Sequence, residues 1–150
     1  MVTQNSVDLV ESFWKEVWQT PDNINAVDRF VTEDFVVTTG GRDIVGREAF
    51  KRWISEFRTQ IDDLKFDIVH TFQSGDGKFV SARFRIRGLN NGLMGFPADR
   101  RPIEFTGNAI WHVGPQGRLV HNWVERSSFE LFRDLHGISH VNDPFAVARQ

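Results

Sequence analysis

IEFTGNAIWHVGPQGRLVHNWVERSSFELFRDLHG, residues 103–137, is the most informative segment of this chain. Two runs with the alternation of β-strands flank a tight Gly-Pro-Gln-Gly turn at residues 114–117, which predicts a hairpin. The second run passes through Trp123 directly into a short helical pattern, which Gly137 is placed to end. A strand that brings polar side chains to the start of a helix is a suitable place for a pocket.

Two further strands are predicted upstream of this hairpin. Residues 64–72 alternate between apolar and polar side chains, and residues 80–87 do the same. Between them, Ser-Gly-Asp-Gly at residues 74–77 is typical of a hairpin turn. Residues 35–39 are β-branched and strand-like, and the pair Gly40-Gly41 ends them.

Helical patterns dominate the first part of the chain. Apolar residues recur at helical spacing in residues 6–18, with Ser6 as the expected N-cap, then in residues 24–31 and in residues 46–57. Helices therefore come first and a mostly antiparallel sheet follows. This order predicts an α+β fold, in which a curved sheet wraps around N-terminal helices.

Length and composition limit the possible functions. A chain of 150 residues favours a single domain over residues 1–150. The net charge of −2 gives no electrostatic case for nucleic acid or membrane surfaces, and the lack of cysteine excludes thiol chemistry. The start of the chain does not resemble a signal peptide and no apolar run reaches membrane-spanning length, so a cytoplasmic protein is expected. The 14 Phe and 5 Trp, without any Tyr, can fill a core or line an apolar pocket.

The chain resembles the SnoaL-like polyketide cyclases, which have the cystatin-like α+β cone shared with nuclear transport factor two. The resemblance covers roughly residues 7–137 and rests on the order and spacing of several pieces, of which none is specific alone. These pieces are residues 13–18, 32–36, 46–50, 80–88, 92–97 and 117–123.

The resemblance implies a pocket in the mouth of the cone and chemistry without a metal or organic cofactor. The family includes aldol cyclases, hydroxylases, isomerases and hydrolases, and its members are often dimers. We therefore expect a cofactor-free acid/base enzyme of the cyclase or isomerase type, acting as a homodimer on a flat, apolar, oxygen-rich small molecule. The alternative is a non-catalytic binding or dimerisation module of the same fold.

Two positions depart from the family pattern. The resemblance places a catalytic Asp four residues after the Trp of the last strand, where this chain has Ser127. It also places a His early in the first strand, where this chain has Thr38. A hydroxyl accepts a proton poorly near pH 7 unless a base activates it. Ser127 also fits a capping box with Glu130, in which case its role is structural.

Glu125 is the first candidate for the missing acid/base, because it shares a strand face with Trp123 and a desolvated carboxyl has a raised pKa. His112 and His121, on the two strands of the last hairpin, form a second candidate pair. Two histidines without a third ligand are weak evidence for a metal, and none is expected. Each of these residues can equally lie on the surface.

His70 and Arg83 complete the catalytic candidates. His70 interrupts an apolar strand face, so it is either a satisfied core residue or a pocket acid/base. Arg83 heads a stripe with Arg85 and Arg87, which is either a solvated or dimer face or a clamp for a carboxylate or enolate. The expected substrate-binding residues are Trp123, Ser127, Thr38, Trp14 and Phe96, the last from the loop of residues 88–102 that is placed to cover the pocket.

Overall fold

A six-stranded curled sheet forms the body of the protein, whose computed structural model describes residues 5–21 and 23–137. The strands lie in the order β2-β1-β6-β5-β4-β3, and every neighbouring pair is antiparallel except β1 and β6. The strands are β1 (Val31–Thr39), β2 (Arg42–Val45), β3 (Ile61–Gln73), β4 (Phe79–Asn90), β5 (Pro102–Val113) and β6 (Leu119–Arg126). The predicted α+β fold with a mostly antiparallel sheet is confirmed.

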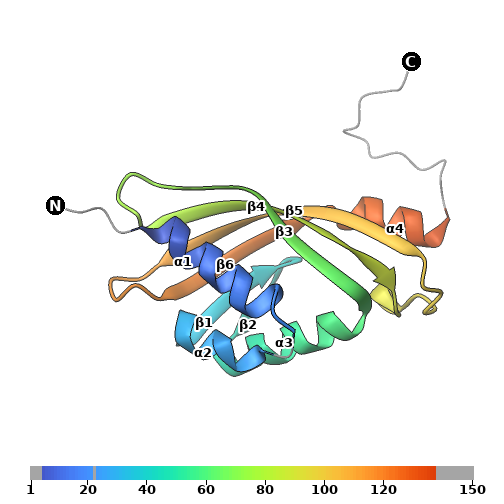
Figure 1. The fold of residues 1–150 in the computed structure, drawn as a ribbon, viewed down its shortest axis with the longest axis horizontal. Helices are drawn as coiled ribbons and strands as arrows, with labels where there is room; N and C mark the ends of the chain where they lie inside the picture. The colour runs from blue at the N-terminus through green and yellow to red at the C-terminus, as the bar shows by residue number, and fades with distance from the viewer. Residues whose placement is uncertain (1–4, 22, 138–150) are drawn as a thin grey trace, which may run out of the picture.

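Three N-terminal helices cover one face of the sheet, and a fourth helix lies at the far end of β5 and β6 (Figure 1). The four are α1 (Ser6–Phe13), α2 (Val27–Phe30), α3 (Arg47–Thr59) and α4 (Ser128–His136). Shorter turns are the π-helix η1 (Trp14–Trp18) and the 3₁₀ segments η2 (Ile24–Ala26) and η3 (Leu93–Gly95). We call the helix-covered face of the sheet the inner face and the opposite one the outer face.

The first helix begins one residue earlier than predicted. Asn5 is its N-cap, and the Asn5 side chain accepts a hydrogen bond from the backbone N–H of Asp8. Ser6 is instead fully buried, and its hydroxyl donates to the carbonyl of Gly77 in the β3–β4 turn. The prediction of Ser6 as the cap was therefore wrong, because tertiary packing gave that hydroxyl another partner.

The hairpin of residues 103–137 forms as predicted, with β5, β6 and then α4. Gly137 ends α4 at a φ of +74°, a left-handed conformation that glycine adopts readily. Gly107 in β5 has a different reason to lack a side chain. A Cβ there would lie 2.3 Å from Cζ of Phe84 and 2.7 Å from the carbonyl oxygen of Glu125, so only glycine allows these strands and the Phe84 ring to pack this closely.

The short strand β2 was not predicted. Gly40-Gly41 is a turn that leads into β2 rather than the end of the strand system. Three of its four residues are exposed and only Ile44 is partly buried, so the sequence of β2 lacks the apolar alternation that predicts a strand.

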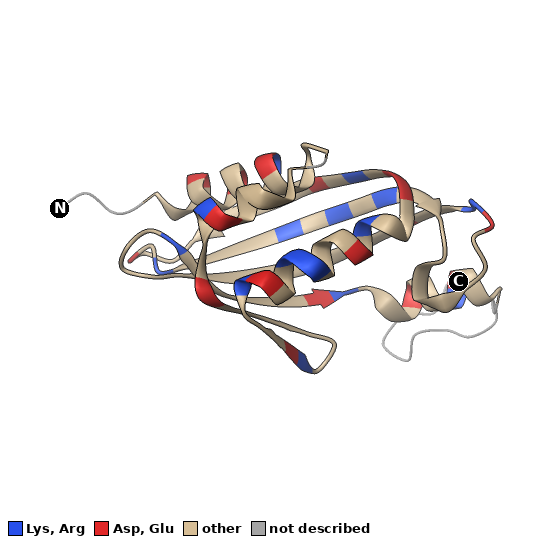
Figure 2. Ribbon diagram, turned by 90° about the horizontal axis from the view of Figure 1, so that it is seen from below, with Lys and Arg blue, Asp and Glu red and all other residues tan. Residues whose placement is uncertain are grey.

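Across the described residues, no helix is long and apolar enough to cross a membrane. Helices α2, α3 and α4 each carry both acidic and basic residues, whereas α1 carries only Asp8 and Glu11 (Figure 2).

Candidate functional site

A small cavity lies between the helices and the inner face of the sheet. It measures about 20 Å³, which is room for one water molecule or for one polar group of a ligand. Its walls come from η1, α3 and five strands and are mostly aromatic or aliphatic. The lining residues are Trp14, Trp18, Val37, Phe50, Trp53, Phe66, Phe84, Ala109, Trp111, Asn122, Val124 and Arg126.

The π-helical turn η1 supplies two of the four tryptophans in the cavity wall. The backbone N–H of Gln19 bonds the carbonyl of Trp14, five residues earlier, at 3.0 Å. This wide turn brings Trp14 and Trp18 to the same side of the helix, and both are buried against the ring of Phe66. Arg58 stabilises the end of the turn, because its guanidinium donates to the carbonyl of Trp18 at 2.9 Å. Such π-turns frequently mark functional sites.

Four buried polar atoms of the lining residues have no hydrogen-bond partner among the described residues. They are the indole Nε1 atoms of Trp14 and Trp111, Oδ1 of Asn122 and Nε of Arg126. Buried polar atoms are nearly always hydrogen-bonded, and each that is not needs an explanation. Four such atoms belong to side chains around one cavity, which makes this region the candidate binding site.

Arg126 is the only titratable residue among those that line the cavity. Its Nη1 donates to the hydroxyl of Thr39 at 2.6 Å, and its guanidinium carbon lies 5.0 Å from the centre of the Trp53 ring. Burial lowers the pKa of Arg126 to about 10, an effect that the negative charge of Glu125 partly opposes. The guanidinium is therefore still charged at neutral pH. The cavity can hold an electron-rich group, but its lining has no carboxylate or imidazole to accept a proton.

Glu125 and Trp123 lie on the outer face, away from the cavity. Both are exposed residues of β6, whereas Asn122, Val124 and Arg126 of the same strand point inward. The expectation that Glu125 lies beside indole rings in a pocket is therefore corrected. Trp123 does stack on a ring, that of His121 at 3.8 Å, but this pair is on the outer face.

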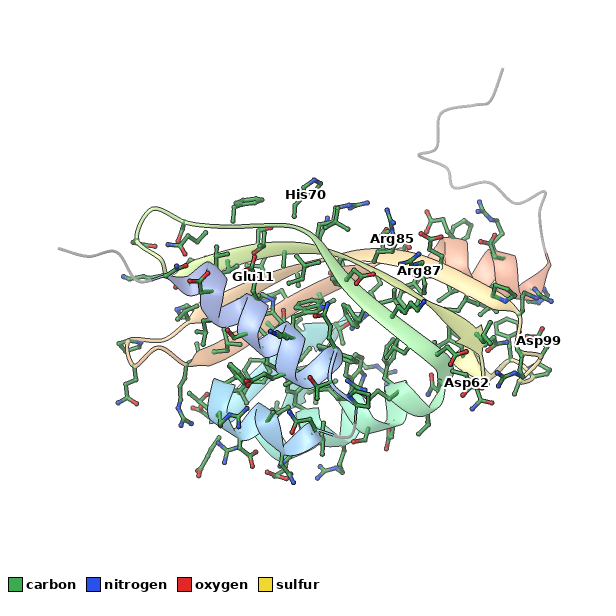
Figure 3. The ribbon with its side chains drawn as sticks, viewed as in Figure 1. Glu11, Asp62, His70, Arg85, Arg87 and Asp99 are labelled. Atoms are coloured by element: carbon green, nitrogen blue, oxygen red, sulfur yellow. The ribbon has the colours of Figure 1, made fainter. Side chains whose placement is uncertain are left out.

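His70 and Arg83 also lie on the outer face, where they are register partners on β3 and β4. The strand alternation had placed His70 with the buried side of Phe66. A β-bulge between Ile68 and His70 inserts one extra residue and reverses which face the rest of the strand presents. Figure 3 accordingly shows His70 pointing away from the helices. Arg83 is exposed and donates to Oδ1 of Asn108 at 3.3 Å.

His112 and His121 lie on the two strands of the hairpin and are register partners across β5 and β6, on the outer face. His112 stacks on Phe79 with ring centres 4.8 Å apart. Thr38 lies beside this pair, because its hydroxyl contacts Nε2 of His121 at 2.9 Å and donates to Asp43 at 2.6 Å. Burial lowers the pKa of His121, the charge of Asp43 opposes this, and His112 adds to it. No group of three potential metal ligands occurs in the part of the chain that the structure describes.

Ser127 and Phe96 stabilise the position of α4 rather than the cavity. The hydroxyl of Ser127 accepts from the N–H and donates to the carbonyl of Thr106, at 3.1 and 3.3 Å. Ser127 therefore stands at the N-cap position of α4 without a capping hydrogen bond from its side chain, and the predicted capping box does not form. Phe96 packs on the rings of Phe132 and His136, with centres 5.6 and 5.9 Å away. Of the expected substrate-binding residues, only Trp14 lines the cavity.

The sequence-based reasoning missed Arg126 and Asn122. A usable signal was present on the neighbouring strand. Ala109 and Trp111 of β5 lie on the opposite strand face from the polar residues Asn108 and His112, and hairpin pairing places Asn122 opposite Trp111 and Val124 opposite Ala109. Because paired residues share a sheet face, the buried Trp111 places Asn122, and with it Val124 and Arg126, on the inner face of β6.

The curled sheet with helices over one face, closed around a small aromatic cavity, defines an α+β cone of the type found in nuclear transport factor two and ketosteroid isomerase. The sequence profile of the SnoaL-like polyketide cyclases matches residues 8–135. The chain therefore belongs to the SnoaL-like polyketide cyclase family. Among curated proteins, no sequence matches the chain.

Solved structures share the fold at low sequence identity. A proposed SnoaL-like polyketide cyclase from Jannaschia sp. CCS1 superposes with a TM-score of 0.79 at 13% identity, covering 87% of this chain and 90% of that one. IdmH from Streptomyces antibioticus, a proposed polyketide cyclase, has a TM-score of 0.74 at 19% identity, with 89% and 99% covered. A protein of ketosteroid isomerase-like fold from Catenulispora acidiphila, solved with trimethylamine, has 0.62 at 17%, with 83% and 86% covered.

Proposed function

We propose that the protein binds a small, apolar, oxygen-rich molecule in the cavity of the cone, without a metal or organic cofactor. The observation that carries this proposal is the set of four unpartnered polar atoms around one aromatic cavity. One polar group of a ligand would complete their hydrogen bonds, and burying it among indole and phenyl rings would exclude water. The absence of cysteine agrees with a cytoplasmic protein, which we also propose.

The exposure of the lining residues indicates where a ligand would enter the cavity. Of the lining residues, Trp53 and Arg126 alone are partly exposed, while the others are buried. A ligand would therefore place one polar group inside and leave its remaining atoms between these two side chains. The residues that line the cavity include no acid/base group that could reach the enclosed part of a ligand. This favours a binding protein over an enzyme.

Family membership favours a second function, turnover of an enolisable molecule by a cyclase or isomerase mechanism. Arg126 and the indole N–H groups would then stabilise an enolate oxygen, which is an electrostatic contribution to catalysis. The four predicted catalytic residues, Glu125, His112, Arg83 and His70, all lie outside the cavity. We therefore rank this function below simple binding.

Tryptophan fluorescence is expected to report ligand binding, because four of the five tryptophans line the cavity and only Trp123 does not. Titration with flat naphthols and hydroxyquinones should change the emission saturably. Trp14→Phe, which removes one buried N–H donor, should weaken binding roughly fivefold. Trp123→Phe is the matched control and should bind like the wild type.

Mass spectrometry of the same mixtures distinguishes the two functions. A ligand recovered unchanged supports binding, and a ring-closed or isomerised product supports turnover. If no compound of the panel changes the tryptophan emission of the wild type or of Trp14→Phe, both the binding function and the turnover function are refuted.

We also propose that the protein is a homodimer that associates through the outer face of the sheet. Three rows of side chains cross β4, β5 and β6 there, and Ile110 and Trp123 in the middle row are 48% and 37% exposed. The rows are Phe79, His112 and His121; Ser81, Ile110 and Trp123; and Arg83, Asn108 and Glu125.

The charged residues of these rows allow two copies of the outer face to pair with opposite charges in contact. In the last row Arg83 lies on β4, Asn108 on the central β5 and Glu125 on β6, and neither Arg83 nor Glu125 forms an ion pair with another described residue. A two-fold axis along β5 in the plane of the interface exchanges β4 with β6. It places Arg83 of each copy against Glu125 of the other, and Ile110 against Ile110.

Charge exchange tests this arrangement. Arg83→Glu or Glu125→Arg alone should weaken association at least tenfold, because like charges then face each other. The double variant Arg83→Glu/Glu125→Arg should restore it. Sedimentation equilibrium measures the dissociation constants. A double variant no better than the single variants, or a wild type that stays monomeric at all accessible concentrations, contradicts the interface.

A further inference from the structure

We infer that the group received by the cavity is an anion, a carboxylate or an ionised enol or phenol oxygen, which is bound by Arg126. The inference rests on the small-molecule binding proposed above and specifies the chemistry of the ligand. It is carried by the charge balance of the cavity, by the donor character of its polar atoms and by the position of Arg126 at its opening.

The charge balance sets Arg126 apart from the other cations that are largely buried. Lys51 Nζ lies 3.0 Å from Asp28 Oδ1, and Nε of Arg47 lies 3.4 Å from the same oxygen. By contrast, no carboxylate within residues 5–21 and 23–137 forms an ion pair with Arg126. Buried charges in proteins are usually paired, so an unpaired buried guanidinium calls for an anionic partner.

The unpartnered atoms are mainly donors. Indole N–H and guanidinium N–H groups can only donate, so Trp14, Trp111 and Arg126 together require acceptor lone pairs. A water molecule brings two protons of its own, whereas an anionic oxygen brings lone pairs alone. The fourth atom, Oδ1 of Asn122, is the single acceptor of the set. Three donors against one acceptor favour a ligand group that mainly accepts hydrogen bonds, such as an anionic oxygen.

Neighbouring residues hold the guanidinium where an entering anion would meet it. The Thr39 hydroxyl occupies Nη1 and the Trp53 ring supports the guanidinium plane at 5.0 Å, which leaves Nε for the ligand. Because Arg126 and Trp53 are the two lining residues that are partly exposed, the carboxylate would enter first and an attached aromatic ring would remain against Trp53.

Salicylate and salicylamide are a suitable pair of probes, since they have nearly the same size and differ in charge. Tryptophan fluorescence at pH 7 should show salicylate binding at least tenfold more tightly to the wild-type protein. Arg126→Met should reduce this preference to about twofold or less, and Arg126→Lys, which keeps the charge but not the planar fork, should retain part of it. Arg52→Met, which changes an exposed arginine of α3, should retain the full preference.

The outcomes separate the two proposals. Equal binding of both probes, or a salicylate preference that survives Arg126→Met, overturns the anionic ligand and leaves small-molecule binding intact. A failure of both probes, together with failure of the neutral naphthols, overturns both. A preference lost with Arg126→Met and kept with Arg52→Met supports the inference.

Discussion

Trp111→Ala is expected to lower the free energy of unfolding by about 4 kcal/mol, which is typical when a large aromatic side chain is removed from a core. Trp111 is 2% exposed and is the largest fully enclosed side chain among the described residues. Its ring centre lies 5.0 Å from that of Phe13 and 6.2 Å from those of Trp14 and Phe35. It therefore joins η1, α1 and β1 to the centre of the sheet, and alanine would leave a void beside the existing cavity.

Urea denaturation at a fixed protein concentration measures the loss. Trp111→Phe keeps most of the ring contacts and should cost only about 1 kcal/mol. Phe129→Ala, which truncates an aromatic residue that is 42% exposed on α4, should change stability by less than about 0.5 kcal/mol. A loss below about 2 kcal/mol for Trp111→Ala would show that this core is not packed as described.

Arg126→Met is expected to stabilise the unliganded protein by about 2 kcal/mol at pH 7. Burial lowers the pKa of the arginine to about 10, well below its usual value, which corresponds to roughly 3 kcal/mol against the charged folded state. Methionine removes that cost but also loses the hydrogen bond to Thr39 and the contact with Trp53, which together return about 1 kcal/mol.

The pH dependence identifies the cause of this gain. Below pH 10 Arg126 is charged in both states and its burial costs the full amount. Above about pH 10 the unfolded chain binds more protons than the folded one, because its arginine keeps the higher, ordinary pKa, so wild-type stability rises relative to that of the variant. Denaturation of both proteins at pH 7 and near pH 11 should show the difference shrinking. Equal stability at pH 7, or a difference that grows above pH 10, speaks against an unpaired buried charge.

A residue that lowers stability and is nevertheless present in the core is typical of a functional site. In this protein the stabilising substitution is also the one expected to abolish the preference for an anion. A gain in stability with a loss of binding would link the two properties to a single side chain.

Much of the architecture was predictable from residues alone. Helical spacing and strand alternation are local patterns, and they gave the three N-terminal helices, the long strands, the last hairpin and the end of α4 at Gly137. The order and spacing of short segments gave the family. Such patterns are readable because each element has one face that must be buried.

The candidate site was less predictable, because its residues depend on which strand face looks inward. In β6 both faces carry aromatic or polar side chains, so alternation separates Trp123 and Glu125 from Asn122 and Arg126 without saying which pair meets the helices. In β3 a bulge after Ile68 moves His70 to the outside, and no local pattern marks it. The sequence by itself therefore determined the elements, their order and the family of this protein. Tertiary packing alone chose the inner face and left Arg126 buried there without a carboxylate partner among the described residues, because a strand offers two faces and only contacts with the rest of the chain distinguish them.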